Sequence, residues 1–129
     1  MKNTEIKSFL YKGFNCLILE VSWSGHLCGY VEIPEGHILH DVYYSDERFP
    51  HLLVHGGITH SGKLHDRGGY FLGFDCAHHG DLLPKYRDRT PGEVYRDEAY
   101  VTAQIERLVD QIEKVKKVTF EDYKFVVSE

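Results

Sequence analysis

Residues 101–115 read VTAQIERLVDQIEKV and carry the clearest structural signal in the sequence. Apolar side chains recur at helical spacing, which predicts one stripe of a helix lying on a sheet. Just upstream, Thr90-Pro91-Gly92-Glu93 has a capping-box pattern, with Thr90 as N-cap, Pro91 at the first helical position and Glu93 reaching back. We therefore predict a long amphipathic helix that starts near Thr90. Its apolar stripe consists of Val101, Ile105, Leu108, Val109, Ile112 and Val115.

Strand signals fill the first two-thirds of the chain. Residues 5–11 and 14–22 are apolar runs separated by a Lys-Gly turn, and LCGYVEI (27–33) follows a second turn. Pairing Leu17 with Val31 and Val21 with Leu27 gives this hairpin one apolar face. Residues 37–51 are interpreted as a long loop, and a last strand near 118–127 is expected to return to the sheet.

These elements predict an α+β fold. With 129 residues, 42% of them apolar, the chain suits a single domain spanning 1–129. We expect an antiparallel β-sheet built of hairpins, with one long C-terminal amphipathic helix packed on one face. Free sheet edges on so small a domain favour a homodimer.

Charge and cysteine content exclude some classes of protein. The formal net charge of −5 argues against general nucleic-acid binding, although a local basic patch at Lys85, Arg87 and Arg89 stays open. No apolar run approaches the roughly 20 residues that span a bilayer, and the N-terminus lacks a signal peptide. Three cysteines without CxxC spacing indicate reduced thiols, so we expect a cytoplasmic protein without membrane partners.

Two segments concentrate the reactive side chains, LLVHGGITH (52–60) and GGYFLGFDC (68–76). As an antiparallel hairpin centred near His65, they place His55 opposite Asp75, Gly57 opposite Gly73 and Thr59 opposite Phe71. Odd positions then form a face of polar groups and glycines, and even positions face the core. The predicted core positions are Leu52, Val54, Ile58, Tyr70, Leu72 and Phe74.

Two glycines on neighbouring strands suggest a place where a ligand approaches the backbone. His78 and Asp81, in the turn that follows, can reach the same region as His55 and Asp75, where an Asp–His contact would orient an imidazole for acid–base work. Three structural interpretations stay open: Asp75 caps a turn, His55 is its structural partner, and the glycines mark bulges. Cys76 falls on the core-facing parity and is interpreted as a small buried apolar residue.

Other histidines and other chemistries receive less support from the sequence. His26, His40, His51 and His65 lie in predicted turns and loops and are interpreted as surface residues. The His55–His60 spacing differs from the helical HExxH motif, and no CxxC pair supports a structural zinc, so metal binding stays open. No cofactor is assigned, because phosphate and dinucleotide glycine fingerprints are absent from the sequence.

The segments VHGGITHSG and GGYFLGFDCAHHGD, with YVTAQIERLVDQI downstream, resemble a family of small bacteriophage and prophage proteins. That family shows a VHGGLTY-like segment, then GFDCAH-x-GD and a closing helix, and the resemblance spans about residues 11–112. It implies a biological setting and gives no reaction. His60 departs from the family's usual tyrosine, and His79 occupies a variable position. The motif falls on His55, Gly56, Gly57, Thr59, Gly73, Phe74, Asp75, Cys76, His78, Gly80 and Asp81.

Three functions follow as hypotheses. The first is binding of a small ligand of nucleotide type, with a phage setting suggesting counter-defence against host immunity. The second is a hydrolase, with or without a divalent metal, whose catalytic residues would be His55, Asp75, His78 and Asp81. The third is a protein-binding inhibitor of a host factor that uses residues 37–51. Phe71 or Tyr86 would supply an aromatic ring that stacks on the ligand. The ligand-binding candidates are His55, Gly56, Gly57, Thr59, Phe71, Gly73, Asp75, His78 and Arg87.

Overall fold

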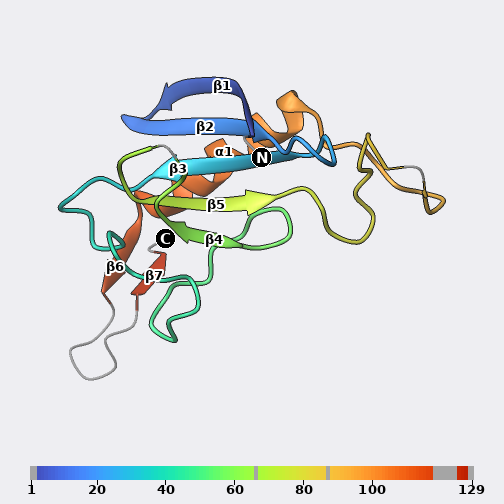
Figure 1. Ribbon diagram of the computed structural model, residues 1–129. Helices are drawn as coiled ribbons and strands as arrows, with labels where there is room; N and C mark the ends of the chain where they lie inside the picture. Colours follow the sequence, from blue (N-terminus) through green and yellow to red (C-terminus); the bar gives the residue numbers. More distant parts are fainter. Residues whose placement is uncertain (1–2, 66, 87, 118–124, 128–129) are drawn as a thin grey trace.

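A five-stranded antiparallel sheet with one helix on its back forms the body of the protein (Figure 1). The computed structural model describes residues 3–65, 67–86, 88–117 and 125–127. The strand order is β1-β2-β3-β5-β4, and a separate two-stranded ribbon pairs β6 with β7. The elements are β1 (Thr4–Tyr11), β2 (Phe14–Glu20), β3 (Leu27–Glu32), β4 (His60–Gly62), β5 (Phe71–Asp75), α1 (Glu98–Ile112), β6 (Val115–Lys117) and β7 (Phe125–Val127).

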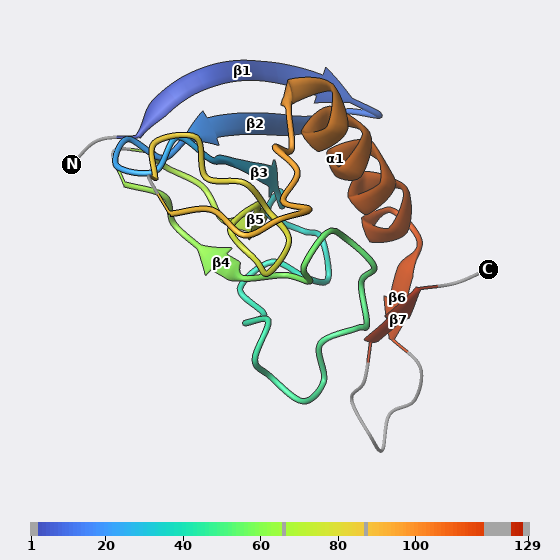
Figure 2. The ribbon, with the colours of Figure 1, turned by 90° about the vertical axis from the view of Figure 1, so that its right-hand side faces the viewer.

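Helix α1 lies along one face of the sheet, as Figure 2 shows from the side. The predicted α+β class, with a hairpin-built sheet and one packed helix, is confirmed. The apolar stripe from Val101 to Ile112 is fully buried against the sheet, where Ile18, Leu72 and Phe74 meet it. Each such side chain contributes about 1.5–3 kcal/mol when it is removed from water. This apolar contact joins helix and sheet.

The helix begins later than the capping-box pattern predicts. Its N-cap is Asp97, whose carboxylate accepts from the Tyr100 N–H at 2.9 Å, and not Thr90. Thr90 instead closes a turn, accepting from the Glu93 N–H at 3.3 Å. Val94 then forms a parallel bridge with Asp81. The segment 90–96 therefore pairs with residues near Asp81 instead of starting the helix. A capping-box motif depends on neighbouring residues only and cannot predict such pairing.

The pairing of β2 with β3 differs from the prediction by one residue. Cys16 faces Val31 and Leu17 faces Tyr30. The turn begins inside the expected strand, because the Val21 N–H donates to the His26 carbonyl at 2.9 Å. A one-residue shift moves side chains to the opposite face. Leu17 therefore joins Tyr30 on the face away from α1, in a second apolar cluster with Leu19, Cys28 and Phe71.

The predicted hairpin of 52–60 with 68–76 is wrong for its first segment. Residues 52–59 form no strand, and β4 pairs His60 with Gly73, so Gly57 is not opposite Gly73. The reason is that Gly56 and Gly57 have φ of +69° and +80°, in a turn closed by the Gly57 N–H on the Val54 carbonyl at 2.9 Å. The predicted core positions are nevertheless correct: Leu52, Val54, Tyr70, Leu72 and Phe74 are buried, and Ile58 packs against them.

The end of the chain also departs from prediction. Phe125–Val127 pairs with β6 instead of returning to the main sheet, and residues 118–124 lie outside the described range. Residues 37–51 contain no strand or α-helix and consist of turns, as expected for a long loop. Within the described residues, no helix combines the length and apolarity needed to cross a membrane.

Candidate functional site

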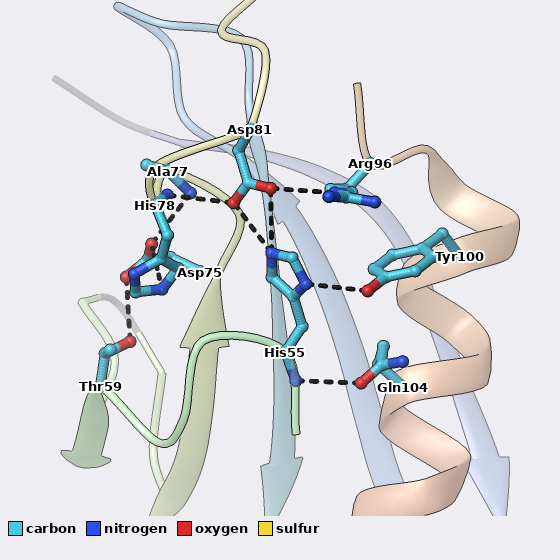
Figure 3. Close-up of polar contacts among 9 residues, drawn as sticks. All are labelled: His55, Thr59, Asp75, Ala77, His78, Asp81, Arg96, Tyr100 and Gln104. Carbon is cyan, nitrogen blue, oxygen red and sulfur yellow. Dashed lines mark hydrogen bonds and ion pairs between the residues drawn. The ribbon is translucent and has the colours of Figure 1, made fainter. Parts of the chain in front are cut away.

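A buried carboxylate organises the candidate site (Figure 3). The Asp81 side chain is 1% exposed and lies between His55 and Arg96. His55 Nε2 is 2.8 Å from Oδ2, Arg96 Nε donates to Oδ1 at 2.9 Å, and the His78 backbone N–H donates to Oδ2 at 3.0 Å. A buried charge is tolerated only when it is paired and hydrogen-bonded, and Asp81 meets both conditions.

The charge state of Asp81 follows from these contacts. Burial raises the pKa of the Asp81 carboxyl, but the hydrogen bonds from His55, Arg96 and the His78 N–H outweigh burial, so the net pKa lies below its usual value. Asp81 is therefore a carboxylate at neutral pH and accepts hydrogen bonds only. His55 Nε2 must carry a proton in order to donate to it.

His55 has no ring nitrogen left for a ligand or a metal. Its Nδ1 lies 2.8 Å from the Tyr100 hydroxyl, and its backbone N–H donates to Gln104 Oε1 at 2.9 Å. The Arg96 guanidinium in turn lies 5.1 Å from the centre of the Tyr100 ring. The hydrogen-bonded chain Tyr100–His55–Asp81 fixes the His55 tautomer and orientation.

Asp75 and His78 form a second, more exposed pair beside this network. His78 Nε2 is 3.3 Å from Asp75 Oδ1, and the two side chains are 35% and 30% exposed. Thr59 Oγ1 donates to Asp75 Oδ2 at 3.0 Å, and the Ala77 N–H donates to Oδ1 at 3.0 Å. Asp75 therefore also caps the following turn, as one structural interpretation anticipated. Among the described residues, the buried His78 Nε2 finds no hydrogen-bond partner, because its 3.3 Å contact with Asp75 is poorly aligned.

The four predicted acid–base residues do come together. The His55 and His78 ring centres are 6.0 Å apart, and Asp81 contacts both residues. The pairing differs from the hairpin prediction, since His55 contacts Asp81, and Asp75 contacts His78. The turn after β5 thus brings Asp81 against the His55 ring (Figure 3).

The predicted ligand space above Gly73 is filled by the protein itself. A Cβ on Gly73 would lie 2.3 Å from the Tyr30 ring, and one on Gly56 would lie 2.2 Å from the His78 ring. Gly57 is different, because a Cβ there would meet no atom within 4 Å. Gly56 and Gly73 therefore permit close side-chain packing, and the interpretation of Gly57 and Gly73 as one cleared ligand face is wrong.

The other residues singled out in the sequence differ in their exposure to solvent. Phe71 is 7% exposed and packs in the cluster with Leu17 and Tyr30, so little of its ring is available for stacking. Cys76 is buried, as predicted, and burial raises the pKa of its thiol to about 12. His79 is exposed, and Arg87 lies outside the described residues.

The side-chain partners of Asp81 and His55 were not among the predicted site residues; they are Arg96, Tyr100 and Gln104. Their spacing of four residues, beside the apolar stripe of the helix, was the available signal. His26 was also misjudged as a surface residue. It is 5% exposed and its Nδ1 contacts Ser24 Oγ at 2.5 Å; burial lowers its pKa despite the nearby carboxylates.

A small cavity of about 200 Å³ opens beside the cluster. His78, His79 and Tyr86 line it together with the carboxylate residues Asp88 and Glu93. The half-exposed Tyr86 ring also packs against Trp23, with ring centres 5.3 Å apart. Among the residues that the structure describes, no group of three or more His, Cys, Asp or Glu side chains is arranged to hold a metal ion.

Comparisons with known protein families, with curated proteins and with solved structures found no match to this chain.

Proposed function

We propose that the protein binds a small polar ligand of nucleotide type at the surface formed by Asp75, His78 and the adjoining cavity. The supporting observation is the Asp75–His78 pair, whose side chains are 30% and 35% exposed, held beside the buried Asp81 network. The His78 backbone is tied to Asp81, which holds the partly exposed imidazole in place beside the cavity that it lines. Such a preorganised group binds a ligand at little entropic cost.

The cavity suits the base of a nucleotide better than its phosphates. A volume of about 200 Å³ is below the range of about 300–1,000 Å³ for sites that enclose a whole drug-sized ligand. Tyr86 offers a ring for stacking, and the lining carboxylates of Asp88 and Glu93 repel phosphate. The phosphates would remain outside, near Lys85 and Arg89 on the same loop.

The resemblance to phage and prophage proteins supplies the setting of this proposal. Binding a nucleotide signal made by an infected cell would remove that signal from host immune receptors. This role requires a protein in the bacterial cytoplasm and no membrane partner. We also propose a homodimer, because β1 and β4 are the outer strands of the sheet, and the absolute mass in solution tests it.

Calorimetry of the purified protein with nucleotides and cyclic dinucleotides tests the function, together with mass spectrometry of any co-purifying ligand. We expect binding that the His78→Ala substitution weakens by at least about tenfold, the loss of one charged or well-oriented hydrogen bond. His51→Ala is the matched control, since His51 is exposed and lies outside the cluster. Absence of nucleotide binding to the unmodified protein would refute the proposal.

An acid–base hydrolase is the second candidate, and one observation favours it. The chain Tyr100–His55–Asp81 has the order of groups through which a buried carboxylate and an imidazole activate a hydroxyl. Turnover of cyclic or linear phosphodiesters would support this candidate if Tyr100→Phe abolished turnover and kept substrate binding. Since both His55 nitrogens are occupied, catalysis would have to pass through Tyr100.

A protein-binding role is the third candidate. Ile38, Tyr43 and Tyr44 of the long loop are 40%, 64% and 43% exposed, which gives the loop an apolar contact surface. Capture of one host protein by the unmodified chain, lost on Tyr43→Ser, would favour this role over ligand binding.

A further inference from the structure

The sheet face that α1 leaves uncovered contains a second, larger hollow. Its volume is about 710 Å³, within the usual range of sites for small organic ligands. It lies over β1, β2, β3 and β5, which are neighbouring strands of the sheet in Figure 1. Residues 67–68, which precede β5, also line it. Leu17 and Phe71 contribute to an apolar floor, and both belong to the cluster on this face. None of the residues that form the Asp81 network lines this hollow.

Glu32 presents a carboxylate of fixed orientation to the hollow. Asn15 Nδ2 donates to its Oε1 at 2.9 Å. Its other oxygen, Oε2, occupies the space beside Gly69, where an added Cβ would clash with it. Among the ion pairs of the described residues, none neutralises Glu32. A carboxylate has about four acceptor positions, so Glu32 can accept further N–H groups from a ligand.

Arg67 supplies the opposite chemistry to the same hollow. Its guanidinium is anchored to β1, since one terminal nitrogen, Nη2, lies 2.5 Å from Glu5 Oε1. A guanidinium carries five N–H donors in a planar fork, so donors remain for a ligand acceptor. Because Glu5 offsets the charge of Arg67, while no described residue forms an ion pair with Glu32, the hollow favours a ligand rich in N–H donors over an anion.

We propose that this hollow binds a guanine base. Guanine places two neighbouring N–H donors, N1 and N2, on one edge, where a carboxylate can accept from both. Its O6 and N7 acceptors match the donors of an arginine. The flat ring system covers the apolar lining of the hollow, where Leu10 is 70% exposed beside the nearly buried Leu17 and Phe71. Adenine presents an unprotonated N1 to a carboxylate and is disfavoured by repulsion between two acceptors.

Titration of the isotope-labelled protein with guanosine, inosine and adenosine, followed by amide chemical shifts, tests this site. We expect guanosine to shift the amides of Ser8, Leu17 and Phe71, and to bind about tenfold more tightly than inosine, which lacks the N2 amino group. Adenosine should bind more weakly still. The site is overturned if guanosine shifts none of these amides, or if adenosine binds as tightly as guanosine.

Two substitutions separate this site from the proposed function. Glu32→Gln should weaken guanosine binding by at least about tenfold, because a charge-assisted pair is lost. Glu47→Gln, at an exposed position outside the hollow, is the matched control and should change nothing. His78→Ala should leave the guanosine-induced shifts of the Ser8, Leu17 and Phe71 amides unchanged, since His78 does not line the hollow. Equal affinity of the unmodified and Glu32→Gln proteins would overturn the assignment, whatever the result at His78.

Discussion

Replacing Asp81 with asparagine removes one negative charge from the centre of the network and keeps the shape of the side chain. Asp81 is 1% exposed and accepts from His55, Arg96 and a backbone N–H. Breaking a buried ion pair costs about 3–5 kcal/mol. Since the Arg96 side chain is 25% exposed and can recover some water, we expect the lower end of this range, about 3 kcal/mol.

This loss is a large part of the stability of a small domain, which is about 5–15 kcal/mol in total. For a chain of this length it corresponds to a melting temperature lower by about 10 °C. Asp75→Asn is the matched control, because Asp75 is 30% exposed and its partners are Thr59, Ala77 and a poorly aligned His78. We expect that control to cost about 1 kcal/mol or less.

The pH dependence provides a second, independent measurement. The pKa of Asp81 is lower in the folded protein than the value of about 3.9 in unfolded chains. Its contribution to stability is therefore fully present above pH ~5 and is lost as the pH falls through the folded pKa. The difference between the unmodified protein and Asp81→Asn should shrink below pH ~4. Urea denaturation at pH 7 and pH 3 measures both quantities. An equal difference at the two values, or melting temperatures within about 2 °C of each other at pH 7, would refute the reasoning.

Three further predictions concern packing, hydrogen bonding and thiol reactivity. Gly56→Ala should destabilise the protein by about 2 kcal/mol more than Gly57→Ala in urea titrations, because both have positive φ but only the first meets the His78 ring; equal losses would contradict this packing. Tyr100→Phe should cost about 1 kcal/mol and shift the His55 ring nitrogen resonances, and unchanged resonances would exclude the Tyr100–His55 bond. The thiols should react with Ellman's reagent at pH 8 only after unfolding, since burial raises their pKa to about 11 or 12; fast labelling of the folded protein would argue against that burial. These thiols are Cys16, Cys28 and Cys76.

Much of the core was predictable because burial depends on local periodicity. The apolar stripe of α1 and the apolar even positions of 52–58 and 70–74 lie in the core, although residues 52–59 are not a strand. A turn that keeps its apolar side chains directed inward satisfies the same pattern as a strand. The gathering of His55, Asp75, His78 and Asp81 was also anticipated, but which aspartate contacts which histidine was not.

The sequence alone determined which residues are apolar at a helical or strand period, and hence the α+β class and most of the core. Only the tertiary structure decided the partners. It showed that Tyr30 fills the space over Gly73, that His78 fills the space over Gly56, and that Asp81 meets Arg96. The physical reason is the sequence separation of the residues involved. Local periodicity predicts whether a side chain is buried, whereas strand register, turn geometry and ion pairing depend on residues brought together from distant parts of the chain.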